Sequence, residues 1–157
     1  MIYYVAAHCI RGKGVKERHV RALLGRLDIT DETEVGWIKR NISAIKMHEN
    51  YAIKTFADSD IAVLILDEAV QFTDYIQPIC LWTSMSNPSS DNGIVVGYGL
   101  SEKSDIHHEK LPKVIELPIH TNEDCFLEKP NLAPISSKRT FCAGSGEGSG
   151  VCNGDSG

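Results

Sequence analysis

The sequence predicts an all-β protein in which short antiparallel strands form a barrel or a sandwich. Short apolar or β-branched runs recur along the chain, and turn-forming residues bound each of them. Runs with the 3.6-residue period of a helix are scarce. The chain has 157 residues, of which 42% are hydrophobic, which is enough to bury a core. These observations favour a β architecture over a helical bundle or an alternating α/β fold.

The individual strands are predicted from local composition. One segment is ambiguous: 16–27 has a helical period, yet Val20–Leu24 within it has the composition of a strand. The expected strands are, in chain order, Met1–Ala7, Val35–Ile38, Ile42–Ile45, Ile61–Leu66, Ile94–Val96 and Val114–Ile119.

A turn-rich stretch near the middle divides the chain. Residues 83–93 contain Ser, Asn, Pro, Asp and Gly, including the turn-forming pairs Asn87-Pro88 and Asn92-Gly93. We therefore predict two β domains, at 1–82 and 94–157, joined by a linker at 83–93.

Charge and hydropathy exclude two classes of partner. The net charge is −5, and no cluster of Lys and Arg is longer than two residues. Nucleic acid is therefore not an expected partner. The apolar runs are far shorter than the roughly 20 residues that span a bilayer, so a membrane is not expected either.

The five cysteines leave the redox compartment open. They are an odd number, and none forms a C-x-x-C pair, so zinc-ribbon and thioredoxin readings are weak. One interpretation is a cytosolic protein with reduced, buried thiols. The other is a secreted disulfide protein whose remaining cysteines are missing.

Three residues in distinctive settings suggest nucleophilic catalysis. His8 lies between small apolar residues and a cysteine, Asp60 opens an apolar run, and Ser156 lies in a glycine-rich turn. A serine hydroxyl becomes nucleophilic when an imidazole takes its proton. A carboxylate then orients the imidazole and stabilises its charged form. Separations of 52 and 96 residues suit groups supplied by different strands and loops.

The chain order of the three residues discriminates between hydrolase folds. In α/β-hydrolases the acid and the histidine follow the serine, and in subtilisin the aspartate precedes the histidine. The order here is His8, Asp60, Ser156. It differs from both of those folds and matches the third known order of a Ser-His-Asp triad.

Seven motifs in the same register extend this signal over nearly the whole chain. They are Val5–Cys9 (similar to T-A-A-H-C), Met47–Tyr51 (h-H-P-x-Y), Asp60–Leu64 (D-I-A-L-L), Gln77–Leu81 (P-[IV]-C-L), Val96–Gly99 (V-x-G-W-G, with Tyr98 for Trp), Phe141–Gly144 and Cys152–Gly157. In these residues the chain resembles the chymotrypsin/trypsin family of serine endopeptidases.

The resemblance implies a fold and a role for each site residue. The fold would be two antiparallel six-stranded β-barrels, both incomplete in this chain. The reaction would be peptide-bond hydrolysis through an acyl-enzyme. His8 would be the general base, Asp60 its orienting carboxylate and Ser156 the nucleophile. The backbone N–H groups of Gly154 and Ser156 would form the oxyanion hole. Asp155 would accept the new N-terminus after zymogen cleavage.

Specificity and partners also follow from the resemblance. Gly150, six residues before Ser156, and Val151 take the place of the pocket aspartate of trypsin-like enzymes, which implies an uncharged primary side chain in the substrate. No cofactor and no metal are expected. The expected partners are a polypeptide substrate, an activating protease and protein inhibitors, in a secreted parent protein.

The resemblance further implies that the chain is truncated at both ends. Cys125 would pair with Cys142, whereas the partners of Cys9, Cys80 and Cys152 would lie outside the sequence. No activation terminus is present, so Asp155 would remain an unpaired carboxylate and the oxyanion loop would be disordered or zymogen-like. The 157-residue chain is thus expected to be inactive. The alternative is a protease-like fragment or binding module without catalysis.

Overall fold

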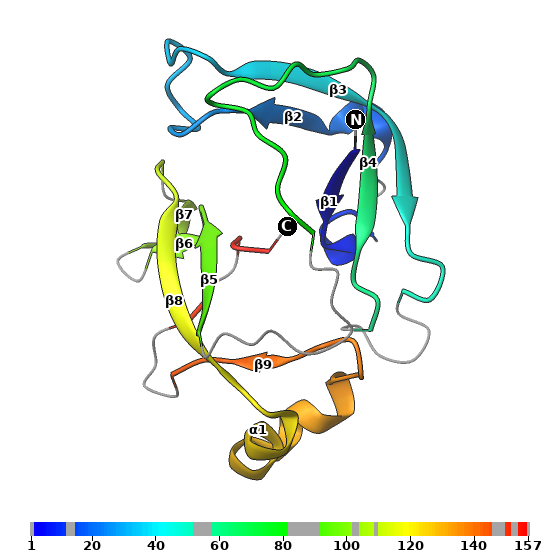
Figure 1. The fold of residues 1–157 in the computed structure, drawn as a ribbon, viewed down its shortest axis with the longest axis vertical. Helices are drawn as coiled ribbons and strands as arrows, with labels where there is room; N and C mark the ends of the chain where they lie inside the picture. The colour runs from blue at the N-terminus through cyan, green and yellow to red at the C-terminus, as the bar shows by residue number, and fades with distance from the viewer. Residues whose placement is uncertain are drawn as a thin grey trace.

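The computed structural model consists mainly of antiparallel strands in curled sheets (Figure 1). It describes residues 2–11, 15–51, 58–81, 92–101, 104–108, 110–145, 150–151 and 154–156. We call the described residues up to 81 the first half and those from 92 onward the second half. The all-β prediction is confirmed, and in the described residues neither half closes into a six-stranded barrel.

The first half is one four-stranded antiparallel sheet with the order β1-β4-β3-β2. Its strands are β1 (Ile2–Val5), β2 (Arg21–Leu24), β3 (Ile38–Met47) and β4 (Ala62–Leu66), and its short 3₁₀ turns are η1 (Ala7–Cys9) and η2 (Glu17–His19). A register shift between Ile42 and Ala44 marks an irregularity in the β3–β4 ladder. Such a shift increases local twist and helps the sheet to curl.

The second half has a three-stranded sheet of order β5-β8-β9 and a two-stranded ribbon, β6-β7. The elements are β5 (Asn92–Gly97), β6 (Leu100–Ser101), β7 (Ser104–His108), β8 (Lys113–His120), α1 (Asn122–Glu128), η3 (Pro130–Ile135) and β9 (Cys142–Ala143). Helix α1 and η3 lie at the far end of this half from β2 and β3 (Figure 1).

The main hydrophobic core lies in the first half. Along β4, Ala62, Leu64 and Leu66 are buried while the two residues between them are partly exposed, which is the two-residue period of a strand with one inward face. The buried members of this core are Ile10, Leu24, Ile42, Leu64, Leu66, Val70 and Ile76.

One local prediction needs correction, and an ambiguous one is resolved. Val35–Ile38 is not a strand: the chain bends there, and Gly36 has a φ of 92°, a left-handed conformation that glycine adopts readily, so β3 begins at Ile38. The ambiguous segment 16–27 contains the short turn η2 followed by β2, so its strand interpretation is confirmed.

The predicted linker lies largely outside the described residues. Its last two residues, Asn92 and Gly93, belong to β5 and not to a linker. The boundaries of the two domains otherwise remain a prediction.

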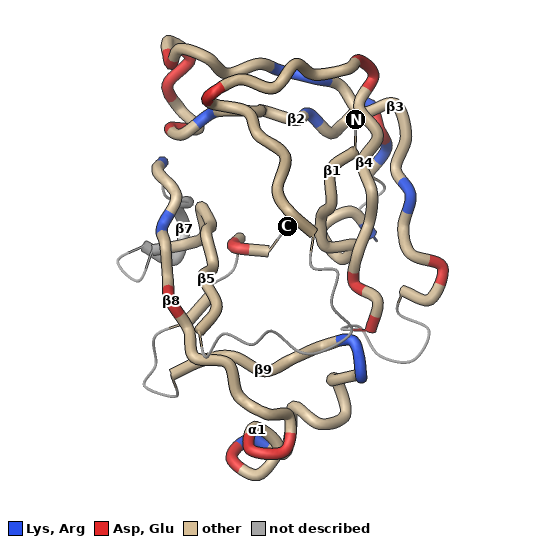
Figure 2. Tube along the Cα trace, viewed as in Figure 1, with Lys and Arg blue, Asp and Glu red and all other residues tan. Residues whose placement is uncertain are grey.

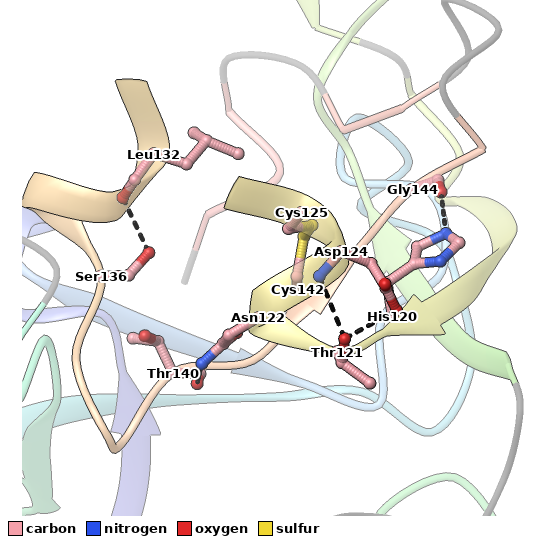
Figure 3. The surroundings of a disulfide bond; sticks show 10 residues. All are labelled: His120, Thr121, Asn122, Asp124, Cys125, Leu132, Ser136, Thr140, Cys142 and Gly144. Carbon is pink, nitrogen blue, oxygen red and sulfur yellow. Dashed lines mark hydrogen bonds between the residues drawn. A yellow bond between two sulfur atoms is a disulfide. The ribbon is translucent and has the colours of Figure 1, made fainter. Parts of the chain in front are cut away.

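The sequence prediction missed helix α1. Thr121 caps it, because its side chain accepts a hydrogen bond from the backbone N–H of Asp124. Glu123 and Asp124 place acidic side chains in the first turn, where they interact favourably with the helix dipole. A disulfide between Cys125 and Cys142 then joins α1 to β9 (Figure 3). This is the pair that the family resemblance implied.

Charged residues are dispersed over both halves (Figure 2). In the second half, a basic segment before β9 lies beside an acidic segment that precedes β4 in the first half (Figure 2). Among the described residues, no helix has the length and apolar character needed to cross a membrane.

Candidate active site

The pairing of β1 with β4 brings His8 and Asp60 together. The strands are antiparallel, and Val5 at the end of β1 is the partner of Ala62 at the start of β4. His8 follows Val5 by three residues, and Asp60 precedes Ala62 by two. The two residues therefore lie just beyond the same end of the β1–β4 strand pair.

Asp60 binds His8 through both carboxylate oxygens. Oδ2 lies 2.6 Å from the ring atom Nδ1 of His8, and Oδ1 accepts the backbone N–H of His8 at 2.8 Å. A carboxylate at Nδ1 favours the tautomer that carries its proton there. Nε2 of the neutral ring is then an acceptor, as a general base requires.

Small residues allow the chain to pack closely beneath this pair. Ala7 has no exposed surface and Ala62 is 1% exposed, and both pack with Tyr51 in a second, small core cluster. The guanidinium of Arg11 lies over the ring of Tyr51, 5.1 Å from its centroid. The His8 side chain remains about half exposed, at 47%, and so is accessible to a substrate.

Ser156 belongs to the other half and lies between the two halves. Residues 154–156, the red segment in Figure 1, reach the space between β1 and β5. The carbonyl oxygen of Ser156 lies 3.6 Å from Cys9 Sγ, and the same sulfur lies 3.6 Å from His8 Nε2. The turn that carries Ser156 is thus adjacent to the His8–Asp60 pair.

The structure places His8, Asp60 and Ser156 in one region, but it does not connect all three by hydrogen bonds. Within the described residues, no hydrogen bond connects the Ser156 hydroxyl to His8. In that same part of the chain, the backbone N–H groups of Gly154 and Ser156 donate to no acceptor. They therefore remain available to an oxygen atom of a ligand.

Asp155 is held by the backbone of the second half, which corrects the expectation of an unpaired carboxylate. Its Oδ1 accepts the N–H of Gly99 at 2.7 Å. A Cβ atom at Gly97 or at Gly99 would collide with the Asp155 carboxylate. Glycine at both positions therefore lets the carboxylate approach the backbone closely, and an N–H dipole offsets part of its desolvation.

A family model for trypsin matches residues 5–157. The chain belongs to the trypsin family. Serine protease gd of Drosophila melanogaster is 31% identical over 159 aligned residues, which cover 88% of this chain and 30% of that protein. CLIP domain-containing serine protease HP8 of Bombyx mori is 29% identical over 171 aligned residues, covering 100% of this chain and 46% of that protein. The chain thus spans less than half the length of these curated relatives.

Other site residues predicted from the family resemblance have fewer contacts. Gly150 and Val151 are exposed, and no described heavy atom lies within 4 Å of a Cβ built at Gly150. The described residues therefore form no pocket wall around that Cβ position. Cys80 is an exposed thiol, and Cys152 lies outside the described residues. The described part of the chain contains no group of three or more His, Cys, Asp or Glu side chains that could hold a metal ion.

The contacts between the halves that the sequence did not predict include two made by the side chains of Tyr98 and Arg139. The hydroxyl of Tyr98, the residue that replaces the family's Trp, lies 2.9 Å from the carbonyl oxygen of Leu27, to which it donates. Burial, with smaller contributions from Glu34 and Asp28, raises the pKa of Tyr98 above its usual value. The other contact joins Asp58 to Arg139, which are 81 residues apart in sequence. No local pattern connects positions so far apart.

Proposed function

We propose that this chain carries the catalytic residues of a serine endopeptidase, with His8, Asp60 and Ser156 as its triad. The observation that carries the proposal is the two-point contact of Asp60 with His8, at 2.6 and 2.8 Å. Membership of the trypsin family supports the same chemistry. A polypeptide is the corresponding substrate.

The proposed reaction follows from the atoms available. Ser156 Oγ attacks the carbonyl carbon of the scissile bond while His8 Nε2 takes the hydroxyl proton. The backbone N–H groups of Gly154 and Ser156 bind the oxyanion, and loss of one such donor costs about 2.7–4 kcal/mol in related sites. The tetrahedral intermediate then breaks the C–N bond, and His8 gives its proton to the leaving amine. Water repeats the sequence on the acyl-enzyme, releasing the acid and restoring Ser156.

We also propose a preference for uncharged primary side chains. Gly150 and Val151 stand where a trypsin-like enzyme has an aspartate, and neither can pair with a substrate Lys or Arg. Cleavage of a peptide library with every residue type at the primary position tests this. Preferential cleavage after Lys or Arg would contradict the proposal.

For the wider setting, we propose a secreted protein that an activating protease converts from a zymogen and that protein inhibitors control. The disulfide between Cys125 and Cys142 supports an oxidising compartment. In the described conformation Ser156 does not hydrogen-bond to His8, so we propose that this form acylates slowly or not at all. Asp155 would change partners on activation.

The decisive experiment is labelling with a fluorophosphonate. The protein is expressed from its full coding sequence, treated with an activating protease and compared with the untreated protein and with Ser156→Ala. We expect label on Ser156 after activation, weak or no label before it, and none on the variant. Absence of label on a folded, activated protein would favour the alternative, a protease-like binding module.

A further inference from the structure

A two-point ion pair joins the halves next to the proposed triad. Arg139 Nε donates to Asp58 Oδ1 at 3.0 Å, and its Nη2 donates to Oδ2 at 2.8 Å. Arg139 lies between η3 and β9 in the second half, and Asp58 lies two residues before Asp60 in the first. Figure 2 shows these basic and acidic segments side by side.

Asp58 is shielded from water, with a side chain only 7% exposed, and Arg139 places an opposite charge against it. A carboxylate removed from water is stable only when hydrogen bonds and an opposite charge replace its hydration. The guanidinium matches both oxygens with parallel N–H groups, which fixes orientation as well as distance. The Arg139 side chain is 54% exposed, so it keeps contact with solvent while it fixes a buried group.

The turn between Asp58 and Asp60 is poorly stabilised by its own residues. Ser59 has a φ of 57°, the left-handed conformation that residues with a side chain adopt rarely. Its Oγ is buried and has no hydrogen-bond partner in the described residues. Across the turn, the Ile61 N–H donates to the Ser59 carbonyl at 2.7 Å. A strained turn persists only when its surroundings hold it.

We infer that Arg139 is a positioning residue: through Asp58, it holds the turn that directs the Asp60 carboxylate onto His8. This inference rests on the proposed function, because it assigns a partner to the same triad. Both Asp60 oxygens already bind His8. A small rotation of the turn would therefore weaken both contacts together. The second half thus contributes to the acid–base pair of the first.

The test uses two readouts on protein expressed from its full coding sequence and activated. One is the downfield NMR resonance of the proton between His8 Nδ1 and Asp60, assigned by its loss in Asp60→Asn. The other is the rate of fluorophosphonate labelling at Ser156. The variants are Arg139→Gln and Arg139→Lys. Lys138→Gln is the matched control, because Lys138 is the exposed neighbour and its replacement removes the same charge.

We expect Arg139→Gln to broaden or abolish the resonance and to slow labelling by on the order of 10- to 100-fold, the scale of a small misplacement in an active site. Arg139→Lys keeps the positive charge but lacks the two parallel N–H groups of the guanidinium. It should therefore show a smaller loss of the resonance and of the labelling rate. Lys138→Gln should match the wild type.

A purely structural role of Arg139 predicts a different pattern. The variant would have lower thermal stability, but its NMR resonance and its labelling rate would be unchanged at temperatures below the unfolding transition. That pattern in Arg139→Gln would overturn the inference. If Arg139→Gln does not fold, the same pattern in Arg139→Lys would do so. Should the wild type fail to label at all, the proposed function fails, whereas the resonance still decides the inference about Arg139.

Discussion

The first half of the molecule places His8 and Asp60 just beyond the ends of two strands of a packed sheet, whereas the second half holds Ser156 on a loop. Seven buried apolar side chains form one cluster in the first half. Among the described residues from 92 onward, Leu117 is the one buried large apolar side chain. Core packing fixes the two strands next to His8 and Asp60, and a hydrogen bond to the backbone of Gly99 holds Asp155 in the turn of Ser156.

Under the proposed function, this difference separates the acid–base pair from the control of the nucleophile. The His8–Asp60 pair depends on the register of β1 and β4, which a packed core fixes. Among the described residues, contacts of the Ser156 turn include the Asp155 carboxylate on the Gly99 N–H and the Ser156 carbonyl near Cys9 Sγ. Surface loops with few packed contacts open at lower free-energy cost than core strands. The turn of Ser156 should therefore change conformation more easily than the His8–Asp60 pair.

The largest expected effect comes from breaking the acid–base pair in the first half. Asp60→Asn keeps the shape but lets His8 adopt the other tautomer, so the activated protein should lose about 10⁴-fold in kcat. Steady-state hydrolysis of a chromogenic peptide measures this. Circular dichroism should show an unchanged fold. A loss below about tenfold would mean that Asp60 does not orient the base.

A substitution in the second half should slow the labelling of Ser156 without disturbing the contact between His8 and Asp60. Gly97→Ala places a methyl group against the Asp155 carboxylate, so Ser156 labelling should slow by about 100-fold or more. Gly93→Ala in the same strand, β5, is the control, because its Cβ would meet Ile119 at an ordinary 3.7 Å. The His8–Asp60 proton resonance should persist in both. Equal labelling of the two variants would show that Asp155 does not hold the turn.

The contrast in packing predicts unequal costs for two leucine truncations. Leu66→Ala removes a side chain from the main cluster and should lower the free energy of unfolding by about 2–5 kcal/mol. Leu117→Ala, outside that cluster, should cost less, because its surroundings can relax into the space. Urea unfolding of both variants gives the comparison. Equal costs would indicate that the second half has a core of similar rigidity.

The smallest expected effect concerns a carboxylate at the end of β4. Hydrogen bonds from the side chain and backbone of Asn41 lower the pKa of Asp67 below its usual value. The stability from this contact is therefore present above pH about 3.9 and lost as the pH falls through the lower folded pKa. Asn41→Ala should raise the pKa of Asp67, as carboxyl-carbon NMR titration would show. An unchanged titration would rule out the side-chain bond as the main cause.

Sequence patterns were informative about strands and motifs, but they did not predict the contacts of Asp155 with Gly99 or of Asp58 with Arg139. The short apolar run Ile61–Leu66 predicted β4, because such runs between turn residues are typical of buried strands. The bend at Gly36 was missed because a Val, a Trp and an Ile around it have strand composition. Helix α1 was missed because a seven-residue helix has too few turns to show a period, although Thr121 was a usable cap signal.

By itself, the sequence determined the fold class and the family, because those depend on local composition and on motif order, and it predicted the residues that would carry the chemistry. Only the tertiary structure decided which groups meet. It placed His8 against Asp60 through strand register, Asp155 against Gly99, and Arg139 against the buried Asp58. These contacts join positions 52 to 81 residues apart, whose distances depend on how the whole chain folds.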